Sequence, residues 1–235
     1  MERSNTLPDP KLNEFLGAIP AVTGCSVRED AAWCLTRLRA VAPPTCVAVP
    51  ADRQQLTALL RYTGEHGISV VPAGAGSKRL CGGISRRADI AVSTEKLARV
   101  IEYPASDLTI TVEAGISIRA LRETLAAQGQ MLPLDVPCAD TATLGGTLAA
   151  NQNGPRRLGL GAWRDNVIGL EFASSEGKLA KGGGRVVKTV AGYDLPKLLI
   201  GSYGTLGVIT EVSLKVFPIP PHTASFMFGY ATPEE

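Results

Sequence analysis

The amino-acid sequence predicts an α+β fold of two lobes: a small parallel βαβ lobe, then a larger, mainly antiparallel sheet flanked by helices. In the first lobe, short apolar runs at 47–49 and 68–71 enclose an amphipathic helical pattern. Strand, helix and strand in that order are typical of a parallel βαβ unit. Farther along, apolar and polar residues alternate over 108–113 and again over 208–217, which is the period of half-buried strands.

The first lobe is expected over about 43–101, and an N-terminal lead-in arm, 1–42, precedes it. The arm contains short helical patterns but no grouping of residues with recognisable chemistry. In the lobe itself, Asp52 is a suitable N-cap for a helix whose leucines recur on one face. A third strand is expected at 89–94.

The second lobe is expected over about 102–218. Ser117 is a suitable N-cap for its first helix, which has an apolar face and is closed by a glycine. A β-hairpin is predicted over 167–181, with its turn at Ser175-Glu176-Gly177. The remaining residues, 219–235, are interpreted as a tail.

The composition excludes several classes of function. With 24 basic and 22 acidic residues, the formal net charge of +2 indicates neither nucleic acid nor an anionic membrane as a partner. The five cysteines include no Cys-x-x-Cys pair, and there are two histidines, so neither a disulfide framework nor a metal site is expected. The polar start lacks the apolar core of a secretion signal, and no apolar run has membrane-spanning length. We therefore expect a globular cytoplasmic protein.

The most informative stretch runs from Val70 to Gly83, where an apolar strand pattern changes abruptly to glycine, alanine and serine. Backbone N–H groups in such a turn converge on a phosphate or pyrophosphate, and Lys78 offers a flexible positive charge. Arg79 occupies the place of the third glycine of a dinucleotide fingerprint, and the Gly-Lys-Ser/Thr of a P-loop is absent, so neither motif is predicted. On this loop alone, an anion site and an ordinary surface turn are both open.

A second stretch of small residues, 141–151, is predicted to contain a helix. Gly145-Gly146 would weaken that helix by about 1 kcal/mol per glycine relative to alanine. Either another backbone packs tightly against the helix or a flat ligand lies over it, and local reasoning favours packing.

Three glycine-rich clusters follow one another, at 72–83, at 141–154 and at 201–210. Their more specific pieces are Ala142-Thr143-Leu144-Gly145-Gly146, Lys188-Thr189-Val190-Ala191-Gly192-Tyr193-Asp194-Leu195 and Gly204-Thr205-Leu206-Gly207-Val208-Ile209-Thr210. This succession resembles the FAD-binding domain of the vanillyl-alcohol oxidase (PCMH-type) flavoprotein family, over about 43–218. Within the family it is most similar to the FAD-binding subunit of bacterial glycolate oxidase, and the 188–195 piece is associated with the hydroxy-acid branch.

The resemblance implies a non-covalent FAD, because family members with covalent FAD have a histidine where this chain has Ser77. It implies that the glycine loop holds the pyrophosphate, that the second cluster lies along the cofactor, and that parts of the second lobe approach it. The implied cofactor-binding residues are Ala73, Gly74, Ala75, Gly76, Ser77, Lys78, Gly82, Pro137, Thr141, Thr143, Leu144, Gly145, Gly146, Ala149, Gly154, Asp165, Val167, Ile168, Val208 and Ile209. No metal is implied.

The resemblance also implies a function: oxidation of a small 2-hydroxy acid, glycolate or D-lactate, by a chain that is the FAD-binding subunit, or a truncated form, of an oxidoreductase. Partner subunits of a glycolate oxidase complex would hold it at the periphery of the inner membrane. The family continues into a substrate or cap domain, of which 219–235 would be the start, so no catalytic base is assigned. The alternatives are a non-catalytic FAD-carrying or assembly subunit and an NADPH-dependent flavin reductase of the same fold.

A few polar residues outside these clusters have two interpretations each. The Arg156-Arg157 pair and Arg164 are suited to a substrate carboxylate, but solvated arginines are the favoured alternative. His66 is either a general base or a solvated residue at a helix end, and the solvated residue is the favoured interpretation. Tyr193-Asp194 is either part of an active-site lining or a capped turn.

Overall fold

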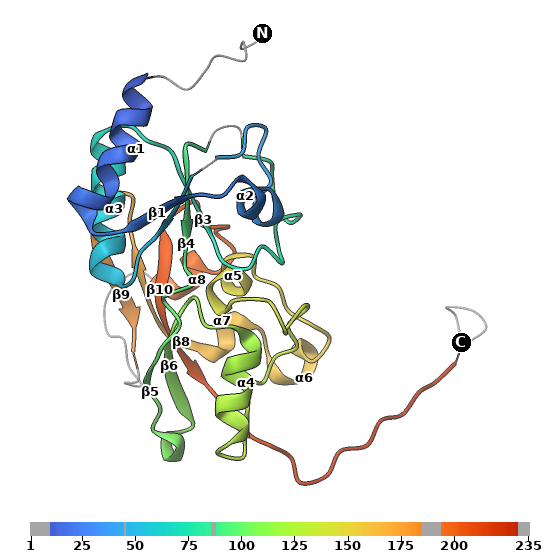
Figure 1. Cartoon of the computed structure of the whole chain (residues 1–235). Helices are drawn as coiled ribbons and strands as arrows, with labels where there is room; N and C mark the ends of the chain where they lie inside the picture. The colour runs from blue at the N-terminus through green and yellow to red at the C-terminus, as the bar shows by residue number, and fades with distance from the viewer. Residues whose placement is uncertain (1–9, 45, 86–87, 185–193, 230–235) are drawn as a thin grey trace.

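The computed structural model describes residues 10–44, 46–85, 88–184 and 194–229 (Figure 1). It confirms the predicted α+β fold, with parallel strands in the first lobe and an antiparallel sheet in the second. The elements of the first lobe are α1 (Pro10–Thr23), β1 (Ser26–Glu29), α2 (Ala31–Arg37), β2 (Cys46–Val49), α3 (Arg53–Glu65), β3 (Val70–Ala73) and β4 (Ile90–Ser93). Those of the second lobe are β5 (Val100–Glu102), the short 3₁₀ helix η1 (Ala105–Asp107), β6 (Thr109–Glu113), α4 (Ile118–Ala126), β7 (Gln130–Met131), α5 (Leu144–Ala149), α6 (Arg157–Leu160), α7 (Trp163–Asn166), β8 (Val167–Ala173), β9 (Leu179–Gly183), α8 (Leu195–Leu199), β10 (Val208–Lys215) and β11 (Phe217–Pro218).

The sheet of the first lobe has the order β1-β2-β4-β3. Strand β4 pairs in parallel with both β2 and β3, so the two strands joined by α3 are not neighbours. Helix α3 begins as predicted at Asp52, whose carboxylate accepts hydrogen bonds from the N–H groups of Gln54 and Gln55, each at 2.9 Å. The first lobe is therefore a sheet in which the returning strand β4 is inserted between the strands of the βαβ unit.

The segment expected to be a lead-in arm takes part in this sheet. Strand β1 pairs antiparallel with β2, helix α1 packs on α3, and α2 covers the opposite face of the sheet through Trp33 and Cys34. Ile19 and Cys25 are buried in the same core as the leucines of α3. Burial of these residues attaches the segment to the first lobe, which in the structure begins before residue 43.

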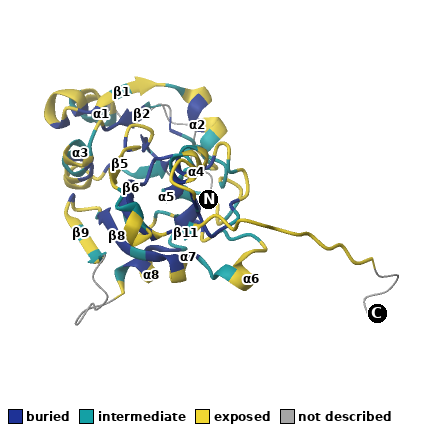
Figure 2. Cartoon of the chain, turned by 90° about the horizontal axis from the view of Figure 1, so that it is seen from below, coloured by how far each residue is buried: buried dark blue, intermediate teal, exposed yellow. Residues whose placement is uncertain are grey.

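The second lobe is built on a five-stranded antiparallel sheet of order β5-β6-β10-β8-β9. Its core contains Trp163 and the apolar face of α4, which begins at Ser117 as predicted. The predicted hairpin is the β8–β9 pair. Strand β11 pairs with β7 in a separate two-stranded sheet, and residues 219–229 follow it as an extended, exposed segment (Figures 1 and 2).

A row of glutamates crosses this sheet where the two lobes meet. Glu113, Glu211 and Glu171 lie opposite one another on β6, β10 and β8, and all three are buried. Arg53, which is on α3 of the first lobe, forms ion pairs with Glu211 and Glu171, and Arg99 forms one with Glu113. The contact between the lobes therefore includes a charged network that crosses from α3 to two strands of the second sheet.

Strand β3 lies at the edge of the first sheet and contains Pro72. Proline has no backbone N–H and is tolerated on edge strands for that reason. The glycine loop leaves this edge strand at its carboxyl end, where α/β folds usually bind ligands.

Candidate functional site

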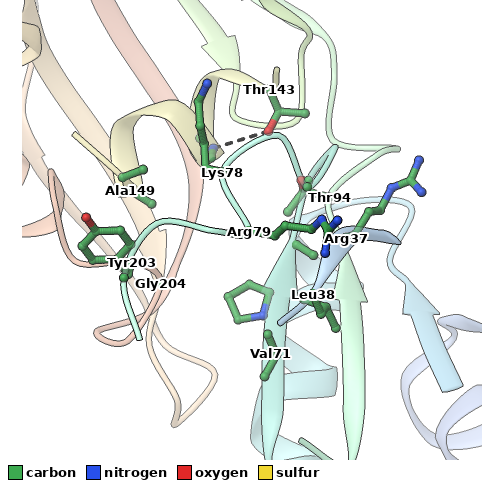
Figure 3. Close-up of a pocket in the computed structure, with 18 of the residues that line it drawn as sticks. Arg37, Leu38, Val71, Lys78, Arg79, Thr94, Thr143, Ala149, Tyr203 and Gly204 are labelled. Atoms are coloured by element: carbon green, nitrogen blue, oxygen red, sulfur yellow. Dashed lines mark hydrogen bonds between the residues drawn. The ribbon is translucent and has the colours of Figure 1, made fainter. Parts of the chain in front are cut away.

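A cavity of about 510 Å³ lies between the two lobes (Figure 3). The glycine loop and the end of α2 line it from the first lobe, and α5, the 203–209 segment and the start of β10 line it from the second. Figure 3 shows Leu38 and Val71 on the first-lobe side and Tyr203 and Ala149 on the second-lobe side. The volume lies within the range of about 300–1,000 Å³ that is typical of ligand clefts.

The glycine loop lines this cavity, and its backbone carries a run of unpaired donors. Within the described part of the chain, the successive N–H groups from Gly74 to Lys78 donate no hydrogen bond. Gly76 has a φ of +73°, and a Cβ there would lie 2.5 Å from the Cα of Arg37, so this position requires glycine. Residues 74–78 are half-buried, and a turn with successive unpaired N–H groups is suited to an anion.

The charges that line the cavity have one sign. Its charged lining residues are Arg37, Arg39, Lys78 and Arg79, with no aspartate or glutamate among the described residues of the lining. The Nζ of Lys78 donates a hydrogen bond to the carbonyl of Pro137 at 2.6 Å, and the guanidinium of Arg37 lies 4.9 Å from the centre of the Trp33 ring. The cavity is therefore electropositive and suited to a diphosphate.

Helix α5 resolves the two alternatives for the small-residue stretch. Thr143 is its N-cap and accepts a hydrogen bond from the N–H of Gly146 at 3.4 Å. A Cβ at Gly145 would lie 2.8 Å from the Cβ of Ala114, so this glycine permits close packing against the end of β6. Gly146 and Ala149 line the cavity, so small residues on this helix also leave a wall without bulky side chains. Both alternatives are therefore correct at different positions: Gly145 permits packing, and Gly146 with Ala149 leaves room for a ligand.

The structure brings most of the predicted cofactor-binding residues to one place. The residues that line the cavity are Ala73, Gly74, Ala75, Gly76, Ser77, Lys78, Gly82, Thr143, Gly145, Gly146, Ala149, Val208 and Ile209. They come from all three glycine-rich clusters, although these are far apart in the sequence.

Seven other predicted residues are outside the lining: Pro137, Thr141, Leu144, Gly154, Asp165, Val167 and Ile168. Leu144 is fully buried in the core of the second lobe, and Gly154 is packed against Asp135. Asp165 accepts a hydrogen bond from the N–H of Ala162 at 2.7 Å, and Val167 and Ile168 start strand β8. Pro137 and Thr141 are exposed on the segment before α5, and Pro137 contacts the site through Lys78.

Sequence reasoning missed several lining residues. Arg37, Leu38 and Arg39 come from the expected arm, where no sequence signal marks them. Tyr203, Gly204, Thr205 and Gly207 also line the cavity, and the third glycine cluster was the signal that pointed to their segment.

The other polar candidates lie elsewhere. The ring of His66, at the end of α3, contacts the rings of Phe15 and Tyr62 in tilted arrangements, and Arg156 forms an ion pair with Asp135. Arg164 donates to the carbonyl of Ile200 at 3.4 Å. None of these residues, nor Arg157 or His222, belongs to the described lining.

Asp194 is the N-cap of α8, as the capped-turn interpretation required. Hydrogen bonding from Lys197 lowers the pKa of this carboxyl group. Most of the motif associated with the hydroxy-acid branch, residues 188–193, lies outside the described residues.

Comparisons with known proteins agree on the family. The family model described as "FAD binding domain" matches residues 44–183. The chain is 34% identical over 178 residues to glycolate oxidase subunit GlcD of Bacillus subtilis, covering 75% of this chain and 38% of that protein. It is 43% identical over 122 residues to glycolate oxidase subunit GlcE of Escherichia coli K12, covering 52% and 35%. It is 30% identical over 218 residues to D-2-hydroxyglutarate dehydrogenase of Xanthomonas citri, covering 92% and 46%.

A solved structure of alkyldihydroxyacetonephosphate synthase has the same fold. It matches with a TM-score of 0.75 at 20% identity, covering 94% of this chain and 43% of that one. The chain thus spans less than half the length of the relatives it matches.

Among the described residues, no helix is long and apolar enough to cross a membrane, and no cluster of three or more potential metal ligands occurs. The chain belongs to the FAD-binding domain family, and FAD is its cofactor.

Proposed function

We propose that the chain is the FAD-binding part of an oxidoreductase that oxidises a small 2-hydroxy acid such as glycolate or D-lactate. The observation that carries the proposal is the cavity between the lobes, where unpaired N–H groups, four basic residues and a flat surface of small residues meet. These are the features that a flavin dinucleotide requires. The relatives named as glycolate oxidase subunits and D-lactate dehydrogenase supply the substrate class.

Each part of the cavity has a role in this proposal. The N–H groups of Gly74 to Lys78 bind the diphosphate, and the charges of Lys78 and Arg79 stabilise it. The small residues of α5 allow a ring to approach the backbone, with Gly146 and Ala149 in the lining. When bound, FAD supplies the acceptor of the hydride equivalent. Ser77 occupies the place of the histidine that carries covalent FAD in other family members, so a cofactor held without a covalent bond is part of the proposal.

The same cavity favours a second candidate function, a subunit that carries FAD without performing catalysis by itself. Removal of the hydroxyl proton of a 2-hydroxy acid needs a general base. The described lining contains no histidine, aspartate or glutamate. A further domain or a partner subunit of a glycolate oxidase complex would supply the base in the first function, whereas in the second the bound FAD is not reduced by substrate.

The experiment separates these functions in two steps. The purified chain is titrated with FAD, and binding is followed by the change in flavin absorbance and fluorescence. Denaturation should then release the flavin into the supernatant, as expected for non-covalent binding. Failure of the folded chain to bind FAD would overturn the proposal at this first step.

The second step adds an electron donor without oxygen and follows bleaching of the flavin. Glycolate, D-lactate and D-2-hydroxyglutarate are tested with the chain alone and with candidate partner subunits. Bleaching by one of the hydroxy acids supports the proposed oxidoreductase. Persistent colour with every hydroxy acid, with and without partners, supports the carrier function, and bleaching by NADPH alone would support a reductase of the same fold.

A further inference from the structure

The backbone of Tyr203 is strained, and this strain occurs at the wall of the cavity. Tyr203 has a φ of +54°, a conformation in which bulky residues are genuine outliers. Gly204, which follows it, and Gly201, two residues before it, also have positive φ and adopt it without steric cost. Strained residues of this kind persist where the surrounding structure holds them, and they concentrate at binding sites.

The main chain around Tyr203 is fixed by the end of helix α5. The N–H of Tyr203 donates to the carbonyl of Ala149 at 2.9 Å, and the N–H of Gly201 donates to the carbonyl of Leu148 at 3.1 Å. These bonds satisfy the last carbonyl groups of α5, which lines the cavity. The main chain that carries the tyrosine ring is therefore anchored to the same helix whose Gly146 and Ala149 line the cavity.

The ring itself reaches from the second lobe to the glycine loop of the first. Its Cδ1 and Cε1 lie 3.2 and 3.3 Å from the position of a Cβ at Gly82, so the ring covers this glycine. The side chain lines the cavity and is 51% exposed, and Figure 3 shows it beside Gly204 and near Ala149. Its hydroxyl makes no hydrogen bond within the described part of the chain. What the side chain offers at this place is an aromatic face.

We propose that Tyr203 is a cofactor-binding residue whose ring stacks on one of the two planar ring systems of FAD. The proposal rests on the proposed function, because it presumes that FAD occupies the cavity. Stacking of an aromatic side chain on a planar ring lowers the Kd of the ligand by about tenfold relative to a site without the aromatic ring. The strained backbone is the cost of placing this ring at the wall of the cavity, against Gly82, where a glycine at position 203 would be more stable.

The test compares Tyr203→Phe, Tyr203→Ala and Tyr203→Gly with the unmodified chain, using FAD titration and urea denaturation without FAD. Tyr203→Phe should keep the Kd for FAD, because the ring remains. Tyr203→Ala should raise it by about tenfold. Tyr203→Gly should raise the Kd similarly while it increases the denaturation midpoint, because glycine removes the strain. A purely structural role would not combine greater stability with weaker binding.

Leu108→Gly is the matched control. Leu108 also has a positive φ, +53°, and is 38% exposed, but it lies outside the described lining of the cavity. This variant should raise the denaturation midpoint and leave the Kd for FAD unchanged. The fluorescence of bound FAD identifies the ring: an increase in Tyr203→Ala indicates stacking on the flavin, and unchanged fluorescence with weakened ADP binding indicates stacking on the adenine.

Two results would overturn the inference. An unchanged Kd in Tyr203→Ala would show that the ring does not contact FAD, and a loss of binding in Tyr203→Phe equal to that in Tyr203→Ala would show that the hydroxyl matters instead. If the unmodified chain itself binds no FAD, the proposed function fails, and this result is distinct from either of the other two.

Discussion

At Gly74 the glycine loop contacts helix α5 so closely that an added methyl group has no room. A Cβ there would overlap the hydroxyl oxygen of Thr143 and lie 3.0 Å from its Cγ2. Thr143 is held in place as the N-cap of α5. We expect Gly74→Ala to lower the free energy of unfolding by about 1–3 kcal/mol, as overpacking does, and to weaken FAD binding by displacing the loop. Urea denaturation and FAD titration measure the two effects.

The control for this prediction is in the same loop. A Cβ at Gly83 would meet no atom within 4 Å, and Gly83 has no positive φ. Gly83→Ala should therefore leave the free energy of unfolding nearly unchanged. If both variants are equally stable, the contact between Gly74 and Thr143 does not constrain the loop.

The cysteines differ in their access to reagents, which gives a binding assay independent of catalysis. Burial raises the pKa of the Cys25 and Cys34 thiols, and the thiolate is the reactive form. Cys138 is exposed, and Cys81 lines the cavity. We expect iodoacetamide to modify Cys138 rapidly and Cys25 and Cys34 only after unfolding. FAD should slow the modification of Cys81 alone, as measured by mass spectrometry of peptides, and equal labelling of Cys81 at saturating FAD would contradict the proposed site.

Among the elements, α3 is joined to the second sheet by Arg53. The Arg53 side chain is 48% exposed, but its partners Glu171 and Glu211 are buried, and they lie opposite each other on neighbouring strands. Removing the cation leaves two buried carboxylates facing each other. Arg53→Ala should lower the free energy of unfolding by about 1–2 kcal/mol, after allowance for solvent screening.

A double-mutant cycle with Glu211→Gln measures how much of this loss belongs to the pair. Lys178→Ala is the control, because Lys178 pairs with Glu176 on the surface of the second lobe. This variant should have no measurable effect on stability. Additive effects of Arg53→Ala and Glu211→Gln would mean that the two side chains do not stabilise each other.

The elements also show the limits of prediction from sequence. The helices capped by Asp52 and Ser117 and the β8–β9 hairpin were predictable, because their signals are local. Strand β1 was not, since Ser26-Val27-Arg28-Glu29 has one apolar residue and depends on pairing with β2. The insertion of β4 between β2 and β3 likewise follows from packing of the whole lobe.

For the whole molecule, the cavity between the lobes makes FAD a link between them. A ligand that binds the folded state stabilises it by about 2.7 kcal/mol at one hundred times its Kd. FAD should therefore raise the denaturation midpoint, and it should slow hydrogen exchange both in the 74–83 loop and in α5. Protection confined to one lobe would contradict a site shared by the two.

At this scale the sequence indicates the site through its three glycine clusters but does not assign each glycine a role. Gly146 lines the cavity, whereas Gly154 is packed against Asp135, and nothing in the sequence distinguishes them. The contribution of Arg37 depends on where α2 lies in three dimensions. Glycine content thus predicts close approach, and tertiary structure decides whether the neighbour is protein or ligand.

Pro72 has a consequence for the behaviour of the protein in concentrated solution. An unprotected edge strand can recruit a strand from another molecule and start aggregation. Pro72 cannot donate a hydrogen bond from the edge strand β3. It therefore interrupts the row of backbone hydrogen bonds that a strand from a second molecule would need. Pro72 also lines the cavity, so strand pairing between two molecules is disfavoured at this edge of the cofactor site even before FAD is bound.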